Sequence, residues 1–215
     1  MNLDQTFTEA YLADQLSHIL SSTGYEVIEG KKQLRKGRFS GFQNVIYAVS
    51  AYADSVWVEF HLGIRVDAIE QMAGRFTRTL PGWRADAHTV VVSEGKLQGQ
   101  PYMRRTAKTV QDLDRIVDEF HHFWEDKGAQ FLDTHTSIRG ADILLNAQPQ
   151  KKSIYLPNQA HRYIKGITAA KLAHNARFTD LAKTYLLAFD TLPNGHLWVE
   201  EYRKLVAYLS NLSLN

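Results

Sequence analysis

The chain of 215 residues is 44% hydrophobic and 22% charged, which is the composition of a globular protein with a substantial core. Its formal net charge of +2 permits nucleic-acid binding but does not demand it, because a surface dominated by phosphate contacts carries a stronger basic bias. Since the sequence has no cysteine, disulfides, thiolate zinc sites and cysteine nucleophiles are excluded, and a reducing compartment fits.

The start of the chain does not have the pattern of a signal peptide. Asp4 and Glu9 stand where positive charge and then an apolar run would be needed. No stretch approaches the ~20 apolar residues of a membrane-spanning helix. We therefore expect a soluble, cytoplasmic protein with no membrane partner.

The first predicted element is a helix that is capped by Asp4 or Thr6 and ended by Gly24. Two short extended pieces follow, from Tyr25 to Ile28 and from Leu34 to Phe39, and we expect both to join a sheet. The connection between them and the second piece carry a basic group that comprises Lys31, Lys32, Arg35, Lys36 and Arg38.

The next two segments predict a β-hairpin. From Phe42 to Tyr52 and from Val56 to Arg65 the residues are rich in β-branched and aromatic types, with a turn between them. With Asp54 and Ser55 as the central turn residues, alternation along both arms places the apolar side chains on one face. The other face then carries Asn44, Ser50, Tyr52, Trp57, Glu59, His61 and Arg65.

A helix is predicted after the hairpin. Asp67 followed by Glu70 is an acidic form of the capping box, and Pro81-Gly82 stops the helix. Its apolar stripe consists of Val66, Ile69, Ala73, Phe76 and Leu80.

The middle of the chain adds strands and a second long helix. His88 to Ser93 is a Val-rich strand bounded by a charged turn from Glu94 to Lys96, and Tyr102 to Arg105 is expected to return beside it as an antiparallel strand. Thr109 caps a helix whose apolar residues occupy one arc and which Gly128 ends.

Beyond this point every pattern is helical. Short helices are expected from Ala129 to Asp133 and from Ser137 to about Asn146, and the linker-like stretch from Gln148 to Lys152 then divides the chain into domains 1–147 and 153–215. The last three predicted helices form an antiparallel pair, Asn158 to His174 and Phe178 to Phe189, with Asn175 in a left-handed position between them, and a packing helix after Gly195.

The predicted fold class is therefore α+β, with an antiparallel sheet of about four to six strands, helices mainly on one face, and a helical C-terminal part. Gly24-Tyr25, Arg35-Lys36-Gly37-Arg38-Phe39, the hairpin and the later helix pair resemble bacterial families of small α+β proteins catalogued as domains of unknown function. Some of these families contain immunity proteins, which bind the toxins encoded beside them. The resemblance implies a protein-binding role and carries over no catalytic residue.

Two groups of residues have the side-chain types of a metal site. Asp86 with Glu94-Gly95-Lys96 has the residue types of a restriction-type nuclease, but a strand separates the carboxylates by roughly 25 Å at ~3.3 Å per residue. His121 and Glu125 lie one helical turn apart, and no third ligand is identified. A metal-dependent hydrolase or nuclease is thus a second alternative only, and we expect no catalytic residue, no metal ligand and no cofactor.

Nucleic-acid binding is the first alternative. The basic group with nearby aromatic residues has the chemistry to follow a phosphate backbone, and Arg104, Arg105 and Lys108 add to it. A charge run in a hairpin connection is, however, more often only solvated.

The mixed face of the hairpin is the leading candidate for a binding site. Aromatic residues beside directional polar groups are enriched in interface hot spots. The competing interpretation is that a helix covers this face and leaves His61 as an interior histidine. We expect a non-catalytic binding protein with a protein partner, and the resemblance implies an immunity-type role. The candidate contact residues are Asn44, Tyr52, Trp57, Glu59, His61 and Arg65.

Overall fold

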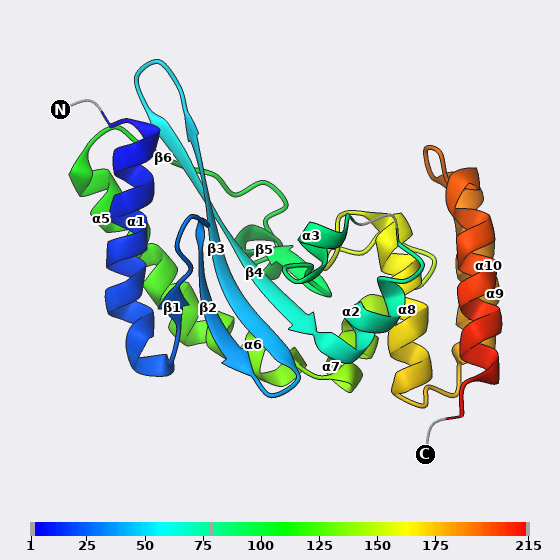
Figure 1. Ribbon diagram of the computed structural model, residues 1–215. Helices are drawn as coiled ribbons and strands as arrows, with labels where there is room; N and C mark the ends of the chain where they lie inside the picture. The colour runs from blue at the N-terminus through cyan, green and yellow to red at the C-terminus, as the bar shows by residue number, and fades with distance from the viewer. Residues whose placement is uncertain (1–2, 78–79, 214–215) are drawn as a thin grey trace. The chain divides into compact units, whose positions relative to one another are not determined.

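The computed structural model describes residues 3–77 and 80–213 (Figure 1). The strands are β1 (Glu26–Val27), β2 (Gln33–Arg38), β3 (Gly41–Ala51), β4 (Val56–Val66), β5 (Val90–Ser93) and β6 (Arg105–Ala107). The helices are α1 (Gln5–Leu20), α2 (Asp67–Ala73), α3 (Pro81–Arg84), α4 (Glu94–Leu97), α5 (Val110–Phe123), α6 (Ala129–His135), α7 (Ile138–Asn146), α8 (Gln159–Leu172), α9 (Phe178–Ala188) and α10 (His196–Asn211). Short turns of 3-10 helix, η1 (Ser21–Thr23) and η3 (Phe189–Thr191), and a π-helical turn, η2 (Trp124–Gly128), complete them.

The α+β prediction is confirmed. The strands form one six-stranded sheet in the order β1-β2-β3-β4-β5, with β6 paired to β4, and the C-terminal part is helical. α1 and α5 lie side by side against the sheet (Figure 1). On its apolar face Phe60 of β4 packs against Phe120 of α5, with ring centroids 4.3 Å apart. This face is buried because alternation along β3 and β4 collects their large apolar side chains there.

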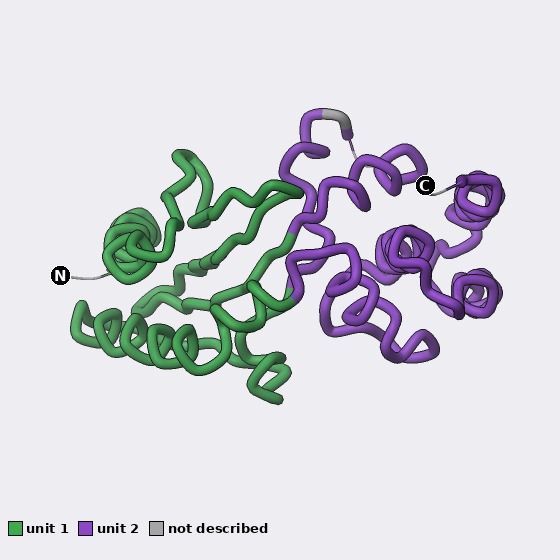
Figure 2. The backbone as a smooth tube through the Cα atoms, turned by 90° about the horizontal axis from the view of Figure 1, so that it is seen from below, with its two compact units in different colours: residues 1–64, 92–134 green, residues 65–91, 135–215 purple. Residues whose placement is uncertain are grey.

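The chain forms two compact units, each made of two segments (Figure 2). The first contains residues 1–64 and 92–134, and the second contains residues 65–91 and 135–215. The predicted linker, residues 148–152, lies inside the second unit. There the buried guanidinium of Arg162 donates to the carbonyls of Leu145, Gln148 and Lys151, at 3.0, 3.0 and 2.7 Å. The stretch is therefore a tethered loop, although its composition is that of a linker.

Several caps were predicted correctly. Asp4 accepts a hydrogen bond from the Phe7 amide at 2.7 Å, and Gly24 takes the left-handed conformation that ends the first helical segment. Thr109 and Asp112 form a reciprocal capping box at the start of α5. Asn158, the first residue of a predicted helix, is the N-cap of α8 and accepts from the His161 amide at 3.1 Å. These contacts are local in sequence, which is why residue type alone indicates them.

The turn of the hairpin lies one residue earlier than predicted. The Tyr52 amide donates to the Ser55 carbonyl at 2.8 Å, which leaves Ala53 and Asp54 at the tip. When the turn moves by one residue, the residue opposite each position of the other strand shifts by two. Because side chains alternate with a period of two, every side chain keeps its predicted face.

The region after the hairpin differs more from the prediction. The capping box at Asp67 is wrong: Asp67 is the first residue of α2 and accepts from Arg65, while Glu70 is buried among other partners. α2 ends at Ala73, and Pro81 and Gly82 begin α3 instead of stopping a helix. Residues 78–79 of the predicted helix lie outside the described residues.

The structure differs from the prediction in one strand pairing and in one turn. β6 pairs with β4, with Trp57 opposite Thr106, and not with β5. Glu94–Leu97 is the short helix α4 and not a turn, because Ser93 caps it and accepts from the Lys96 amide.

Two C-terminal signals were also misread. Gly128 does not end α5, because the chain continues through η2 into α6. A Cβ at Gly128 would stand 3.1 Å from the Trp124 ring and 3.2 Å from the Phe123 ring, so the glycine serves ring packing. Between α8 and α9 the left-handed residue is His174, with φ 53°, and not Asn175.

Candidate functional site

The predicted binding face is partly exposed near the N-terminal end of β4, where Arg104 joins it. We call Tyr52, Trp57, Glu59, His61 and Arg104 together the hairpin surface. Tyr52 is 50% exposed, and Trp57, Glu59 and His61 are half-buried. Ser50 beside them is exposed as well. The face is thus neither fully open nor fully covered at this end.

Aromatic contact organises this surface. Alternation along β4 places Trp57 on the face opposite the apolar core, and its ring lies 4.3 Å from that of Tyr52, centroid to centroid. The guanidinium of Arg104 lies 5.4 Å from the Trp57 ring centroid and donates to Glu59. Arg104 was assigned by its sequence only to the basic alternative, since the pairing of β6 with β4 that brings it here is long-range.

Glu59 and His61 form the polar part of the hairpin surface. Their side chains lie on the same side of β4, with His61 Nε2 3.7 Å from a carboxylate oxygen of Glu59. Burial lowers the pKa of His61 from its ordinary value of 6.5, and Lys96 lowers it further, while Glu59 acts in the opposite direction. Folding therefore favours the neutral imidazole, which presents one donor and one acceptor.

This pKa shift predicts a pH dependence of stability. A histidine whose pKa is lower in the folded than in the unfolded state stabilises the fold fully above its unfolded pKa, and the contribution is lost as the pH falls below that value. We expect His61→Gln to lose less free energy of unfolding than the wild type between about pH 7.5 and about pH 5.5. Glu59→Gln should lose more, because it removes the group that raises the pKa of His61. Denaturant unfolding at each pH measures both, and equal pH profiles for the three proteins would contradict the assignment.

Two predicted contact residues have structural surroundings instead. Asn44 is fully buried; it donates to Gln33 at 2.5 Å and accepts from Arg35 at 3.1 Å. Arg65 is 9% exposed and donates to Asp67 and to the carbonyls of Arg84 and Ala87. The period of a strand indicates which face a residue is on, but not what covers that face.

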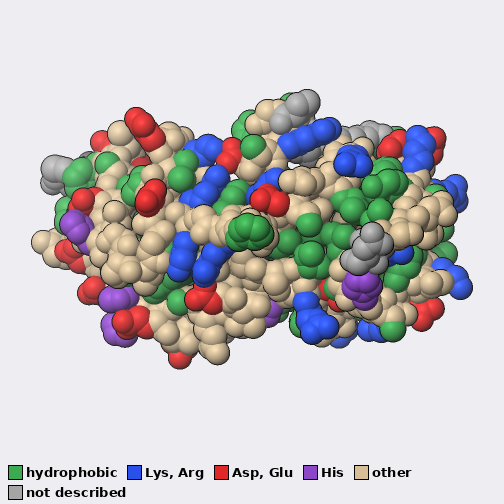
Figure 3. Space-filling model, turned by 60° about the horizontal axis from the view of Figure 1, so that its bottom comes forward, with side chains coloured by type: hydrophobic (Ala, Val, Ile, Leu, Met, Phe, Trp, Pro, Cys, Tyr) green, Lys and Arg blue, Asp and Glu red, His purple; other side chains and the backbone are tan. Residues whose placement is uncertain are grey.

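The basic group of the nucleic-acid alternative is dispersed and engaged. Lys32 and Arg38 form ion pairs with Glu9 and Asp133. The guanidinium of Arg35 stacks on the Phe42 ring of β3, 3.8 Å from its centroid. Lys36 points to the other face of β2. The face of the molecule drawn in Figure 3 carries acidic side chains among the basic ones. Lys32, Arg35 and Arg38 are thus each engaged by a neighbouring side chain of the protein.

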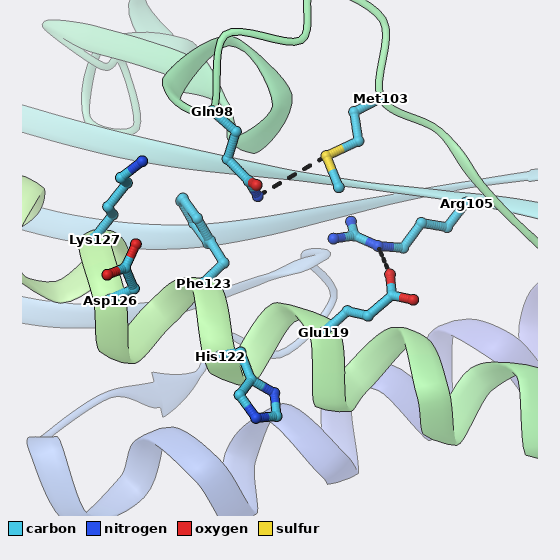
Figure 4. Close-up of a pocket in the computed structure, with 8 residues that line it drawn as sticks. All are labelled: Gln98, Met103, Arg105, Glu119, His122, Phe123, Asp126 and Lys127. Atoms are coloured by element: carbon cyan, nitrogen blue, oxygen red, sulfur yellow. Dashed lines mark hydrogen bonds and ion pairs between the residues drawn. The ribbon is translucent and has the colours of Figure 1, made fainter.

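A second feature of the first unit is a hollow of about 480 Å³ beside α5 (Figure 4). Arg105 lies at its wall and is paired on two sides, with Glu119 at 2.7 Å and with both oxygens of Glu94 at 2.7 Å. Glu94 is 1% exposed. Because Arg105 and Glu94 form a bidentate ion pair, neither the guanidinium of Arg105 nor the carboxylate of Glu94 is available to a ligand. Glu94 of the nuclease constellation is therefore part of a buried structural ion pair.

The histidine pair of α5 has local roles. His121 approaches Glu125 at 3.5 Å, and His122 contacts the Asp118 carbonyl at 2.7 Å and points away from Arg105 in Figure 4. Within residues 3–77 and 80–213, no group of three or more His, Asp or Glu side chains is placed to hold a metal ion. In the same ranges, no helix is both long enough and apolar enough to cross a bilayer.

Comparison with known proteins adds no relative. No family model, curated protein or solved structure matches the chain.

Proposed function

We propose that this is a non-catalytic binding protein that recognises another protein through the hairpin surface. The observation that carries the proposal is the Tyr52–Trp57 pair, in which two aromatic rings stay partly exposed beside a guanidinium. Tyrosine, tryptophan and arginine are the side chains most enriched at the energetic centres of protein interfaces. Glu59 and His61 add directional hydrogen-bonding groups that favour one partner over another.

Within this class we propose an immunity-type role, in which the partner is a toxin. The support is the resemblance of the sequence to families that contain such proteins. The sharpest test uses the protein encoded by the adjacent gene, purified and titrated against this one. A toxin-like neighbour that binds would support the role, whereas a neighbour from a metabolic operon that does not bind would count against it.

Replacing Trp57 by alanine is the direct test of the surface. We expect binding of the partner to weaken by about 2 kcal/mol or more, roughly 30-fold in Kd, because a central aromatic contact is lost. The free energy of unfolding should fall by less than the ~3–5 kcal/mol of a fully buried aromatic, since Trp57 is only half-buried. Titration calorimetry and thermal melts measure the two effects.

Trp83→Ala is the matched control, because Trp83 is 71% exposed and lies in the second unit, outside the hairpin surface. It should bind as the wild type does. Equal weakening by both substitutions, or a Trp57→Ala protein that melts early and binds normally, would contradict the proposal. Retention of the wild type on DNA or RNA at low salt, abolished by charge reversal of Lys31, Lys32, Arg35 and Lys36, would favour the nucleic-acid alternative instead.

A further inference from the structure

The second unit contains a hollow of about 510 Å³ that is separate from the hairpin surface. Its walls come from the tethered loop 148–152, from α8 and from α9 with the turn that follows it. This volume lies within the range of small-molecule sites, roughly 300–1,000 Å³.

One wall of the hollow is apolar and rigid. Tyr163 stacks on Tyr185 with ring centroids 4.8 Å apart and meets Phe189 edge-on at 5.1 Å, so its ring is fixed from behind. Leu187 and Leu192 extend this wall, and Leu187 is 69% exposed although it is a large aliphatic side chain. A hydrocarbon or aromatic body would remove this surface from water.

The loop 148–152 supplies two cations to the lining of the hollow. Lys151 and Lys152 line the hollow, are exposed, and form no ion pair with the part of the chain that the structure describes. The Lys151 carbonyl is held by Arg162, so the position of the loop that bears both lysines is fixed.

Tyr163 provides the second, independent observation. It is only 5% exposed, yet its hydroxyl makes no hydrogen bond with any described residue. Since no described buried side-chain oxygen lacks a partner, that hydroxyl reaches the solvent, and the residue lines the hollow. Burial raises the pKa of Tyr163, so the group stays protonated and is a donor at neutral pH. Because this hydroxyl has no protein partner and is open to the solvent, it can donate to a ligand that enters the hollow.

We infer that this hollow binds a small amphiphilic anion, in which a carboxylate or phosphate is joined to a hydrocarbon or aromatic body. The head group accepts from the Tyr163 hydroxyl and pairs with Lys151 and Lys152, and the body lies against Leu187 and Leu192. No residue of the hairpin surface lines this hollow, so the inferred site can be tested independently of the proposed function.

The first probe is anilinonaphthalene sulfonate, whose aromatic body and single anionic group match this chemistry. We expect saturable binding to the folded protein and displacement by decanoate or decyl phosphate, but not by decyltrimethylammonium of the same chain length. Whichever of decanoate and decyl phosphate competes better identifies the head group. Absence of saturable binding, or displacement by the cation as effectively as by the anions, would overturn the inference.

Variants locate the probe. Leu187→Asp should weaken binding by about tenfold or more, because it places a like charge beside the anion and removes apolar contact. Leu197→Asp is its matched control, since Leu197 is 45% exposed on α10 and does not line the hollow. Tyr163→Phe, which removes only the hydroxyl, should weaken binding by about fivefold.

The charge requirement has its own pair of variants. Lys151→Ala combined with Lys152→Ala should weaken binding by about five- to tenfold and reduce its dependence on salt, whereas Lys183→Ala, an exposed lysine of α9 outside the hollow, should not. Thermal melts confirm that each variant is folded. Unchanged affinity in Leu187→Asp and in the double lysine variant would place the probe elsewhere and refute the site.

Discussion

Replacing Lys165 by methionine is expected to lower the free energy of unfolding by about 3–5 kcal/mol, because it leaves a carboxylate buried without its counter-charge. The Lys165 ammonium lies 3.0 Å from a Glu70 oxygen, and the two side chains are 6% and 4% exposed. Lys165 also donates to the His88 carbonyl at 2.6 Å, while the Thr89 hydroxyl donates to Glu70 at 2.9 Å. Urea unfolding followed by circular dichroism measures the loss.

Lys204→Met is the matched control for this substitution. Lys204 pairs with Glu200 and Glu201 on the exposed side of α10, and such pairs contribute at most about 1 kcal/mol. The double variant Lys165→Met with Glu70→Leu should recover much of the lost stability, because it removes the orphaned charge together with its partner. A double variant as unstable as Lys165→Met alone would show that the charge is not the cause.

Arg162→Met is expected to cost a similar amount, about 3–5 kcal/mol, since three main-chain carbonyls lose their donor at once. Arg162 is 1% exposed, and its guanidinium binds the carbonyls of Leu145, Gln148 and Lys151 without a carboxylate among these partners. The substitution should also release the loop 148–152. Limited proteolysis should therefore cut the variant within this loop under conditions that leave the wild type intact.

Arg162→Lys tests the geometry of the same site. A single ammonium lacks the planar fork that reaches three acceptors, so this variant should be intermediate in stability and in its sensitivity to protease. Arg203→Met, on the exposed side of α10, should behave as the wild type does. A loop that stays resistant in Arg162→Met would contradict the tethering role.

The parts of the fold that the sequence predicts are those set by neighbouring residues. The alternation of β4, the caps at Asp4 and Thr109 and the helix pair of α8 and α9 all depend on spacings of a few residues. The pairing of β6 with β4 depends on residues about fifty positions apart and has no local signal. Composition also failed for the stretch 148–152, because its polar residues are held by an arginine of α8.

The candidate site divides in the same manner. The face shared by Tyr52, Trp57, Glu59 and His61 follows from period two alone. Whether a residue on that face is exposed depends on partners distant in sequence, which is why Asn44 is buried and why Arg104 enters the hairpin surface. The hollow beside Tyr163 had no signal in the sequence, since it forms where a loop and two helices meet.

The interleaving of the two units has a consequence for how the protein can be synthesised. The first unit needs residues 92–134 as well as 1–64, so it cannot close until most of the chain has left the ribosome. Residues 65–91 emerge earlier but pack with residues 135–215. Nearly a hundred further residues must be synthesised after Glu70 before its ion-pair partner Lys165 is present. During that interval a carboxylate and the apolar residues around it are exposed to chaperones and proteases. Truncation at residue 147 would leave residues 65–91 permanently without 135–215, and any continuous fragment that contains the whole of one unit also carries residues of the other.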